Sequence, residues 1–279
     1  MNPESLSIGF SPCPNDTFIF YALVHGLIPL PHIAFAEPVL ADVEQLNRRA
    51  MQGGLDVTKL SFHALGHVLD DYVMLTAGAA LGRGCGPLLV SADPSFRADE
   101  KSRIAVPGTY TTAALLLRLF APEVTRTVVM RFDEIMEAVR NGTVDAGVII
   151  HEGRFTYQDR GLFCLQDLGL WWEKETGFPI PLGCIAARAS LPEPVQREIN
   201  QAIRQSLQWI RRNPGRGQEY IREHARELDD QVLASHIDLY VNDFSEQLGD
   251  EGIGAVQELL RRGRRLGLFP KSGELRWVS

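Results

Sequence analysis

Short apolar runs alternate with amphipathic stretches over residues 1–90. Each short run is bounded by turn residues and is typical of a strand. Strands are predicted at 7–10, 32–37, 55–60, 72–80 and 87–91. The stretches between them have helical spacing and helix-end signals, such as Gly53-Gly54. Helices are therefore predicted at 16–25, 43–51 and 62–69.

The same alternation starts again after Ser91. Strands are predicted at 103–106, 128–132 and 144–150, and helices at 111–120 and 133–141. Strands that alternate with helices and are apolar along their length favour mainly parallel sheets with helices on both faces. The sequence therefore predicts an α/β fold.

The pattern changes after Gly183, where a last strand is followed only by helices. The strand is predicted at 184–189 and the helices at 194–212, 218–227, 231–241 and 255–265. We expect a first lobe at 1–90, an inserted second lobe at 91–182, and a segment, 183–279, that returns to the first lobe as a strand and C-terminal helices. Two lobes joined by two chain crossings can hinge, so the cleft between them is the expected ligand site.

Composition narrows the classes of protein. A chain of 279 residues, with 45% hydrophobic and 23% charged residues, fits a soluble two-lobed protein. The net charge of -7 argues against a nucleic-acid or anionic membrane surface. The four cysteines form no CxxC pair, which argues against a thiolate zinc site and a disulfide framework. With no signal peptide or membrane span apparent, we expect a cytoplasmic protein and leave its oligomeric state open.

Polar residues follow four of the predicted strands. These segments are Ser11–Asp16, Thr58–Ser61, Gly108–Thr112 and His151–Arg154. Ligands of open parallel sheets bind at the carboxyl ends of the strands, where loops lead into helices. At any one of these places the alternative is that serine or threonine only caps a helix. Because all four occur at the same edge, they favour a ligand site.

The segment Gly108–Thr112 indicates the kind of ligand. A glycine turn with two hydroxyls at a helix N-terminus offers free N–H groups and a positive dipole end, which suit an anion. No GK[ST] follows, so the segment is not a P-loop. A carboxylate is the expected ligand group.

His151 ends an apolar strand and therefore lies at the lip of the expected cleft. An ordinary histidine pKa near 6.5 suits a general base at cellular pH, although a lone histidine is more often structural. Glu152 could orient its ring or pair with Arg154, and the alternative for both is a surface loop ion pair.

His63 and His67 are spaced to lie on one helical face, as in some metal sites. No third ligand accompanies them, so we predict a helix surface, with His63 near the cleft mouth, and no metal site.

Six segments together are highly specific: SPCPNDTFIF, DVTKLSFHAL, GTYTTAALLLRLF, VDAGVIIHEGRFTY, LGLWWE and PIPLG. In this order they resemble the 1,4-dihydroxy-6-naphthoate synthases, which act on cyclic dehypoxanthinyl futalosine in the futalosine route to menaquinone. The resemblance implies a fold like the type II periplasmic binding proteins. It also implies a lyase that needs no cofactor and acts on a small carboxylate substrate, releasing a three-carbon fragment.

The resemblance further implies roles for individual residues. His151 is the expected base, as the strand-end argument also favours. The candidates for holding substrate are Ser61, Thr111, Thr112, Asn15 and Lys59. Lys59 alternatively points away from the cleft, because side chains alternate along a strand. Asn15 either contacts substrate or only shapes the wall, whereas Asp16 is expected in the wall.

Two other functions remain open from the sequence. One is chorismate dehydration, a step of the same pathway on the same fold. The other is a cytoplasmic binding or sensor protein for an aromatic carboxylate. HEGR and SPCPNDTF favour the synthase.

Overall fold

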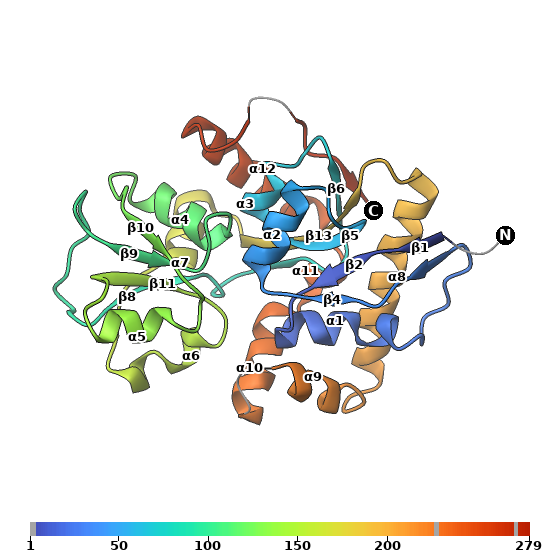
Figure 1. Cartoon of the computed structure of the whole chain (residues 1–279), viewed down its shortest axis with the longest axis horizontal. Coiled ribbons are helices and arrows are strands. Elements are labelled where there is room, and N and C mark those ends of the chain that lie inside the picture. The colour runs from blue at the N-terminus through green and yellow to red at the C-terminus, as the bar shows by residue number, and fades with distance from the viewer. Residues whose placement is uncertain (1–3, 226–228, 271–272) are drawn as a thin grey trace.

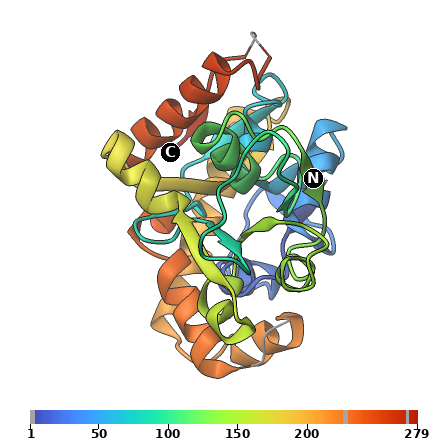
Figure 2. The same ribbon diagram turned by 90° about the vertical axis from the view of Figure 1, so that its left-hand side faces the viewer.

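The computed structural model describes residues 4–225, 229–270 and 273–279. Its two large sheets lie side by side with helices around them (Figure 1). The C-terminal helices surround this core: α12, in red, and α10, in orange, lie at opposite ends of the molecule (Figures 1 and 2).

The larger sheet has seven strands, because segments from both ends of the chain join it. Its order is β14-β6-β13-β5-β2-β4, and β7 pairs with β13 beside this row. The strands are β2 (Ile8–Phe10), β4 (Val39–Leu40), β5 (Val57–Ser61), β6 (Tyr72–Leu75), β7 (Ala80–Gly82), β13 (Ile180–Arg188) and β14 (Trp277–Val278). A separate pair joins β1 (Glu4–Leu6) to β3 (Ile33–Phe35).

The smaller sheet comes from one continuous stretch of chain. Its five strands have the order β10-β9-β11-β8-β12. They are β8 (Leu88–Ser91), β9 (Ile104–Val106), β10 (Thr127–Val129), β11 (Ala146–Ile149) and β12 (Phe163–Asp167).

The helices follow the same division. Beside the larger sheet lie α1 (Pro14–Val24), α2 (Val43–Met51) and α3 (Phe62–Leu65). With the smaller sheet come α4 (Thr112–Phe120), α5 (Ile135–Arg140), α6 (Gly153–Thr156), the 3-10 turn η1 (Gln158–Arg160) and α7 (Leu168–Thr176). The C-terminal segment forms α8 (Glu193–Arg212), α9 (Gln218–His224), α10 (Asp230–Tyr240), α11 (Asp243–Glu246) and α12 (Gly249–Arg265).

Strand direction confirms the predicted α/β class with mainly parallel sheets. Among the described strands, each antiparallel pairing involves β8 or β13, and the other pairings are parallel. These two strands follow the two chain crossings between the sheets. The predicted lobe borders at 90/91 and 182/183 fall inside β8 and β13, and the division into lobes stays a prediction.

The C-terminal segment returns to the larger sheet, as expected. Helix α8 packs along α1, where the Ser206 hydroxyl donates to the carbonyl of Ile19 at 2.7 Å and accepts from the N–H of Leu23 at 3.0 Å. Helix α12 contacts both α3 and α4, so the returning segment touches helices of both sheets.

Some predicted elements differ from the structure. The strand predicted at 72–80 is two strands, because the backbone turns at Gly78 with a φ of 81°. The helix predicted at 62–69 ends at Leu65. β12 and α7 are not among the predicted elements. The strand predicted at 184–189 begins at Ile180, and it is not the last strand, because β14 follows the C-terminal helices. The predicted end of helix 218–227 lies outside the described residues.

Helix α1 begins at Pro14, two residues before the predicted start. Its N-cap is Cys13, and not Asn15 or Asp16, the polar residues expected to cap a helix that starts at residue 16. Proline suits the first helical position, because its φ is already helical and it has no N–H to satisfy.

Within the described residues, no helix is long and apolar enough to span a bilayer.

We expect Gly86→Ala to destabilise the fold. Gly86 lies in the first crossing, and a Cβ there would lie 2.2 Å from the Cα of Gly169 at the start of α7. Backbone atoms cannot move aside cheaply, so the free energy of unfolding should fall by about 2 kcal/mol, as measured by urea denaturation. Gly153→Ala in α6 is the matched control, because its nearest neighbour is 3.6 Å away. Equal stability of the two variants would contradict the prediction.

Candidate active site

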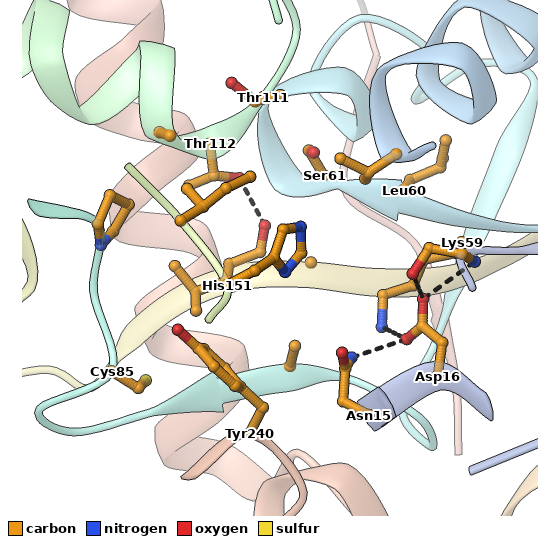
Figure 3. A pocket seen from close by; sticks show the side chains of 18 residues that line it. Asn15, Asp16, Lys59, Leu60, Ser61, Cys85, Thr111, Thr112, His151 and Tyr240 are labelled. Atoms are coloured by element: carbon orange, nitrogen blue, oxygen red, sulfur yellow. Dashed lines mark hydrogen bonds and ion pairs between the residues drawn. The ribbon is translucent and has the colours of Figure 1, made fainter. Parts of the chain in front are cut away.

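A cavity lies where the larger and smaller sheets face each other across the two crossings (Figure 3). It encloses about 660 Å³, counting the part that is open to solvent. Its lining includes every residue proposed from sequence: Asn15, Lys59, Ser61, Thr111, Thr112 and His151. Its apolar walls come mainly from Val43, Leu60, Ala80, Pro87, Ala113, Ile150 and Leu182.

Asp16 organises one wall. Its Oδ1 accepts from the Lys59 ammonium at 2.6 Å and from the Asn15 amide at 2.9 Å. Its Oδ2 accepts from the Ser11 hydroxyl at 2.6 Å and the Ser11 N–H at 3.2 Å. The Lys59 and Asp16 side chains are only 6% and 2% exposed, so this ion pair is buried. Lys59 therefore points toward the cavity, but its charge is directed to Asp16.

Asn15 also joins this wall to the C-terminal segment. Its Oδ1 accepts from Nε2 of His236, in α10, at 3.0 Å. This bond places the proton of His236 on Nε2 and leaves its buried Nδ1 without a partner among the described residues. Burial, and then the nearby His151, lower the pKa of His236 to about 3, so its ring stays neutral. The Asn15 side chain thus holds the wall together through both of its polar atoms.

Ser61 ends β5 and is held by a residue that sequence reasoning missed. The Asn47 amide donates to the Ser61 hydroxyl at 3.1 Å, and its carbonyl accepts from the Ser61 N–H at 2.9 Å. Asn47 is fully buried in α2 and also donates to the carbonyl of Tyr110. The Ser61 hydroxyl keeps its own proton available to a ligand.

The two threonine hydroxyls are already bonded within the protein. Thr111 caps α4, accepting from the N–H of Ala114 at 3.2 Å and donating to the carbonyl of Gly108 at 2.9 Å. Thr112 donates to the carbonyl of Leu182 at 2.6 Å. The groups left open at this helix end are the backbone N–H groups of Thr112 and Ala113, as expected for the first turn of a helix.

The carboxylate of Glu44, which is not part of the cavity lining, connects the two sides of the cavity. Glu44, in α2, accepts from the N–H of Thr109 at 3.1 Å and of Tyr110 at 3.0 Å. Burial raises the pKa of Glu44, while these backbone bonds and Arg48 act against the rise. Glu44 therefore fastens the loop before α4 to α2, beside the larger sheet.

His151 follows β11, as predicted, with only Ile150 between them, and has a φ of 56°. It is the one residue other than glycine with a positive φ among those described. The His151 side chain lines the cavity, and its Nε2 lies 3.8 Å from the sulfur of Cys13, which is outside the lining. The ring also stacks on His236, with centroids 5.9 Å apart and planes at 19°.

The charge state of His151 follows from these neighbours. Burial of the ring lowers the pKa of His151, but Cys13, Glu152 and Asp42 together raise it, and the result is a pKa of about 9. The ring is therefore mostly protonated at neutral pH and becomes a base as the pH rises.

Arg154 is part of a buried anchor, which differs from the surface ion pair considered as the alternative. It donates to the carbonyl of Gly86 and to Asp167, both at 2.6 Å. The Arg154 and Asp167 side chains are 17% and 12% exposed. Asp167 in turn caps α7, so the loop after His151 is tied to the first crossing and to α7.

His63 is buried, with Nδ1 3.1 Å from the carbonyl of Thr111. Burial is the main reason that its pKa falls to about 4. Its ring and that of His67 pack against Tyr110 and Phe269, so these histidines join α3 to its surroundings. In the described parts of the chain, no cluster of three or more His, Cys, Asp or Glu side chains could bind a metal ion.

The architecture and the cleft define a class of protein. The structure resembles the aliphatic sulphonate-binding protein SsuA from Escherichia coli, with a TM-score of 0.65, 14% identity and coverage of 100% of this chain and 94% of that one. Alkanesulfonate-binding SsuA from Xanthomonas axonopodis pv. citri gives a TM-score of 0.70 at 17% identity over 97% and 96% of the two chains. The chain thus has a periplasmic-binding-protein-like fold.

More similar proteins identify the family. A family model described as menaquinone biosynthesis matches residues 6–265. The 1,4-dihydroxy-6-naphthoate synthase of Thermus thermophilus is 50% identical over 96% of this chain and 97% of its own. The protein of the same name from Streptomyces coelicolor is 46% identical over 98% of both chains. Protein AF1704 of Archaeoglobus fulgidus has a TM-score of 0.90 and 37% identity, covering 96% of this chain and 100% of that one.

The chain therefore belongs to the 1,4-dihydroxy-6-naphthoate synthase family of menaquinone biosynthesis enzymes.

The buried ion pair leads to a stability prediction. Lys59→Met leaves the Asp16 carboxylate buried without its counterion, so the free energy of unfolding should fall by about 3 kcal/mol. The double variant that also carries Asp16→Asn should regain part of the lost stability, because the uncompensated charge is removed. Arg197→Met is the control, since Arg197 and its partner Glu193 are 66% and 67% exposed. Denaturant unfolding measures all four proteins, and a Lys59→Met variant as stable as the control contradicts the prediction.

Proposed function

We propose that this protein converts cyclic dehypoxanthinyl futalosine to 1,4-dihydroxy-6-naphthoate and a three-carbon fragment, using His151 as the general base. The observation that carries the proposal is the position of His151. Its ring faces an apolar cavity that also contains the open N–H groups at the start of α4. This reaction requires a base, a group that binds the carboxylate, and apolar walls that keep water away from the bicyclic ring.

The substrate carboxylate binds at the N-terminus of α4. The N–H groups of Thr112 and Ala113 and the positive end of the helix dipole attract an anion there. The Ser61 hydroxyl, at the neighbouring end of β5, donates a further hydrogen bond. The hydroxyls of Thr111 and Thr112 already have partners in the protein. These residues therefore help to bind the carboxylate only by forming the N-terminus of α4.

His151 starts the reaction by taking the proton of a hydroxyl on the part of the substrate that leaves. The O–H electron pair forms the carbonyl of the departing fragment, and the C–C bond to the ring breaks. The electron pair of that bond moves to a ring ketone oxygen, which becomes an enolate and then takes up a proton. Aromatisation of the ring favours this direction, so positioning and exclusion of water are the main contributions of the protein.

Asn15 and Lys59 act mainly through the wall in this proposal. Their polar groups bond to Asp16 and His236, so they hold the turn before α1 against the cavity. Because the ammonium of Lys59 is paired with Asp16, this wall adds no net charge to the site.

We further propose that the lobes 1–90 and 91–182 separate to admit substrate, with residues 183–279 moving with the first. The bonds that would break include those from Glu44 and Asn47 to the loop before α4. All four cysteines are free, as a cytoplasmic enzyme would keep them.

We expect His151→Asn to abolish turnover and to leave binding of 1,4-dihydroxy-6-naphthoate nearly unchanged. Asparagine tolerates the left-handed backbone of this position and cannot act as a base. Loss of a general base should lower kcat by about 1000-fold, measured by product formation from cyclic dehypoxanthinyl futalosine. His25→Asn, on the exposed end of α1, is the control.

A folded His151→Asn variant with wild-type kcat removes His151 from the mechanism. Binding of the naphthoate without turnover by wild-type protein indicates a sensor instead.

The pH dependence tests the charge state of the base. Only neutral His151 accepts a proton, so kcat/KM should rise with pH and level off near its pKa of about 9. Cys13→Ala removes the sulfur that raises this pKa, so the rise should move to lower pH. Cys164→Ala, on the exposed strand β12, should leave the profile unchanged. A Cys13→Ala profile identical to that of the wild type shows that the sulfur does not act on the base.

A further inference from the structure

Tyr240 lines the cavity although it comes from the C-terminal segment. It is the last residue of α10, and its side chain extends into the cavity from the side opposite Leu60 and Ser61 (Figure 3). The ring packs against His236, one helical turn earlier, with centroids 4.7 Å apart. Helix α10 thus contributes Tyr240 to the cavity, and His236 packs between Tyr240 and His151.

The hydroxyl group of Tyr240 has no hydrogen-bond partner among the described residues. The bond from Ser245 to this residue goes to its main-chain carbonyl and leaves the phenol free. Tyr240 is only 8% exposed, and buried tyrosine hydroxyls usually find a partner. An open phenol that faces a ligand cavity indicates a partner that arrives with the ligand.

The other polar side chains near this part of the cavity are occupied or weak donors. Lys59 bonds to Asp16, and the Thr112 hydroxyl bonds to the carbonyl of Leu182. The thiol of Cys85 is a weak donor, and burial raises its pKa to about 12. Burial likewise raises the pKa of Tyr240, which therefore stays protonated and able to donate.

We propose that the Tyr240 hydroxyl donates a hydrogen bond to the ring ketone oxygen that becomes negative when the C–C bond breaks. This inference rests on the proposed function and adds the donor that function lacks. The electron pair of the broken bond moves onto that oxygen, and the phenol stabilises the resulting enolate without giving up its proton. The proton that completes the product hydroxyl comes from protonated His151, directly or through water, which returns the base to its neutral form.

The choice of donor has a physical reason. A neutral phenol in an apolar wall costs no reorganisation when charge develops, and a low dielectric strengthens its hydrogen bond. Its interaction with a neutral ketone is weaker than with an enolate, so it favours the transition state over bound substrate.

Tyr240→Phe tests this role cleanly, because the hydroxyl has no partner in the protein to lose. We expect kcat to fall by about 100-fold, as for the loss of one oxyanion donor. The KM, the melting temperature and the dissociation constant for 1,4-dihydroxy-6-naphthoate should change little.

Tyr72→Phe is the matched control with the opposite signature. The Tyr72 hydroxyl donates to the carbonyl of Leu55 at 2.7 Å, away from the cavity lining. This variant should lose a few degrees of melting temperature and keep wild-type kcat.

The outcomes separate this inference from the function on which it rests. If wild-type protein does not convert cyclic dehypoxanthinyl futalosine, the proposed function and the role of Tyr240 both fail. If wild-type protein is active and Tyr240→Phe keeps its kcat, only the role of Tyr240 fails. A Tyr240→Phe variant that loses kcat together with melting temperature and naphthoate binding shows a structural role and also overturns the inference.

Discussion

The buried carboxylate of Asp16 is the point on which one whole wall of the cavity depends. It accepts hydrogen bonds from Lys59 in β5, from Ser11 in the turn before α1 and from Asn15 in the first turn of α1. A charge buried this deeply is stable only if it is fully paired, so these segments are held in one arrangement. That arrangement brings Cys13 to His151 and joins Asn15 to His236. The surroundings of His151, the proposed base, therefore depend on an ion pair in which His151 takes no part.

The opposite wall of the cavity, at the start of α4, is organised differently. At the start of α4 the hydroxyls of Thr111 and Thr112 donate to carbonyls of the protein, and the backbone N–H groups of the first turn are left open. Glu44, in α2, holds the preceding loop. In the proposed function, the contacts that close the cavity are thus distinct from the groups that meet the substrate. Closure would then exclude water while His151 acts as the base inside.

Much of this arrangement could be predicted from the sequence. The alternation of apolar runs and helical stretches predicts the α/β order, and the polar residues after four strands predict the edge at which the site lies. His151, Ser61, Thr111 and Thr112 line the cavity for this reason. The roles within the lining could not be read in the same way, because a hydroxyl or an ammonium is free or occupied according to neighbours distant in sequence.

The sequence by itself determined the alternation of strands and helices, the family and the strand ends that line the cavity, because periodicity, turn residues and the motif set are local properties. Only the tertiary structure decided that Lys59 turns to Asp16, that Asn47 supports Ser61, and that α10 completes the cavity. His236 and Tyr240 lie in a helix whose pattern shows only that one face is buried. What that face meets depends on packing between segments more than 200 residues apart, since His236 bonds to Asn15 at a separation of 221. No local pattern encodes such a contact.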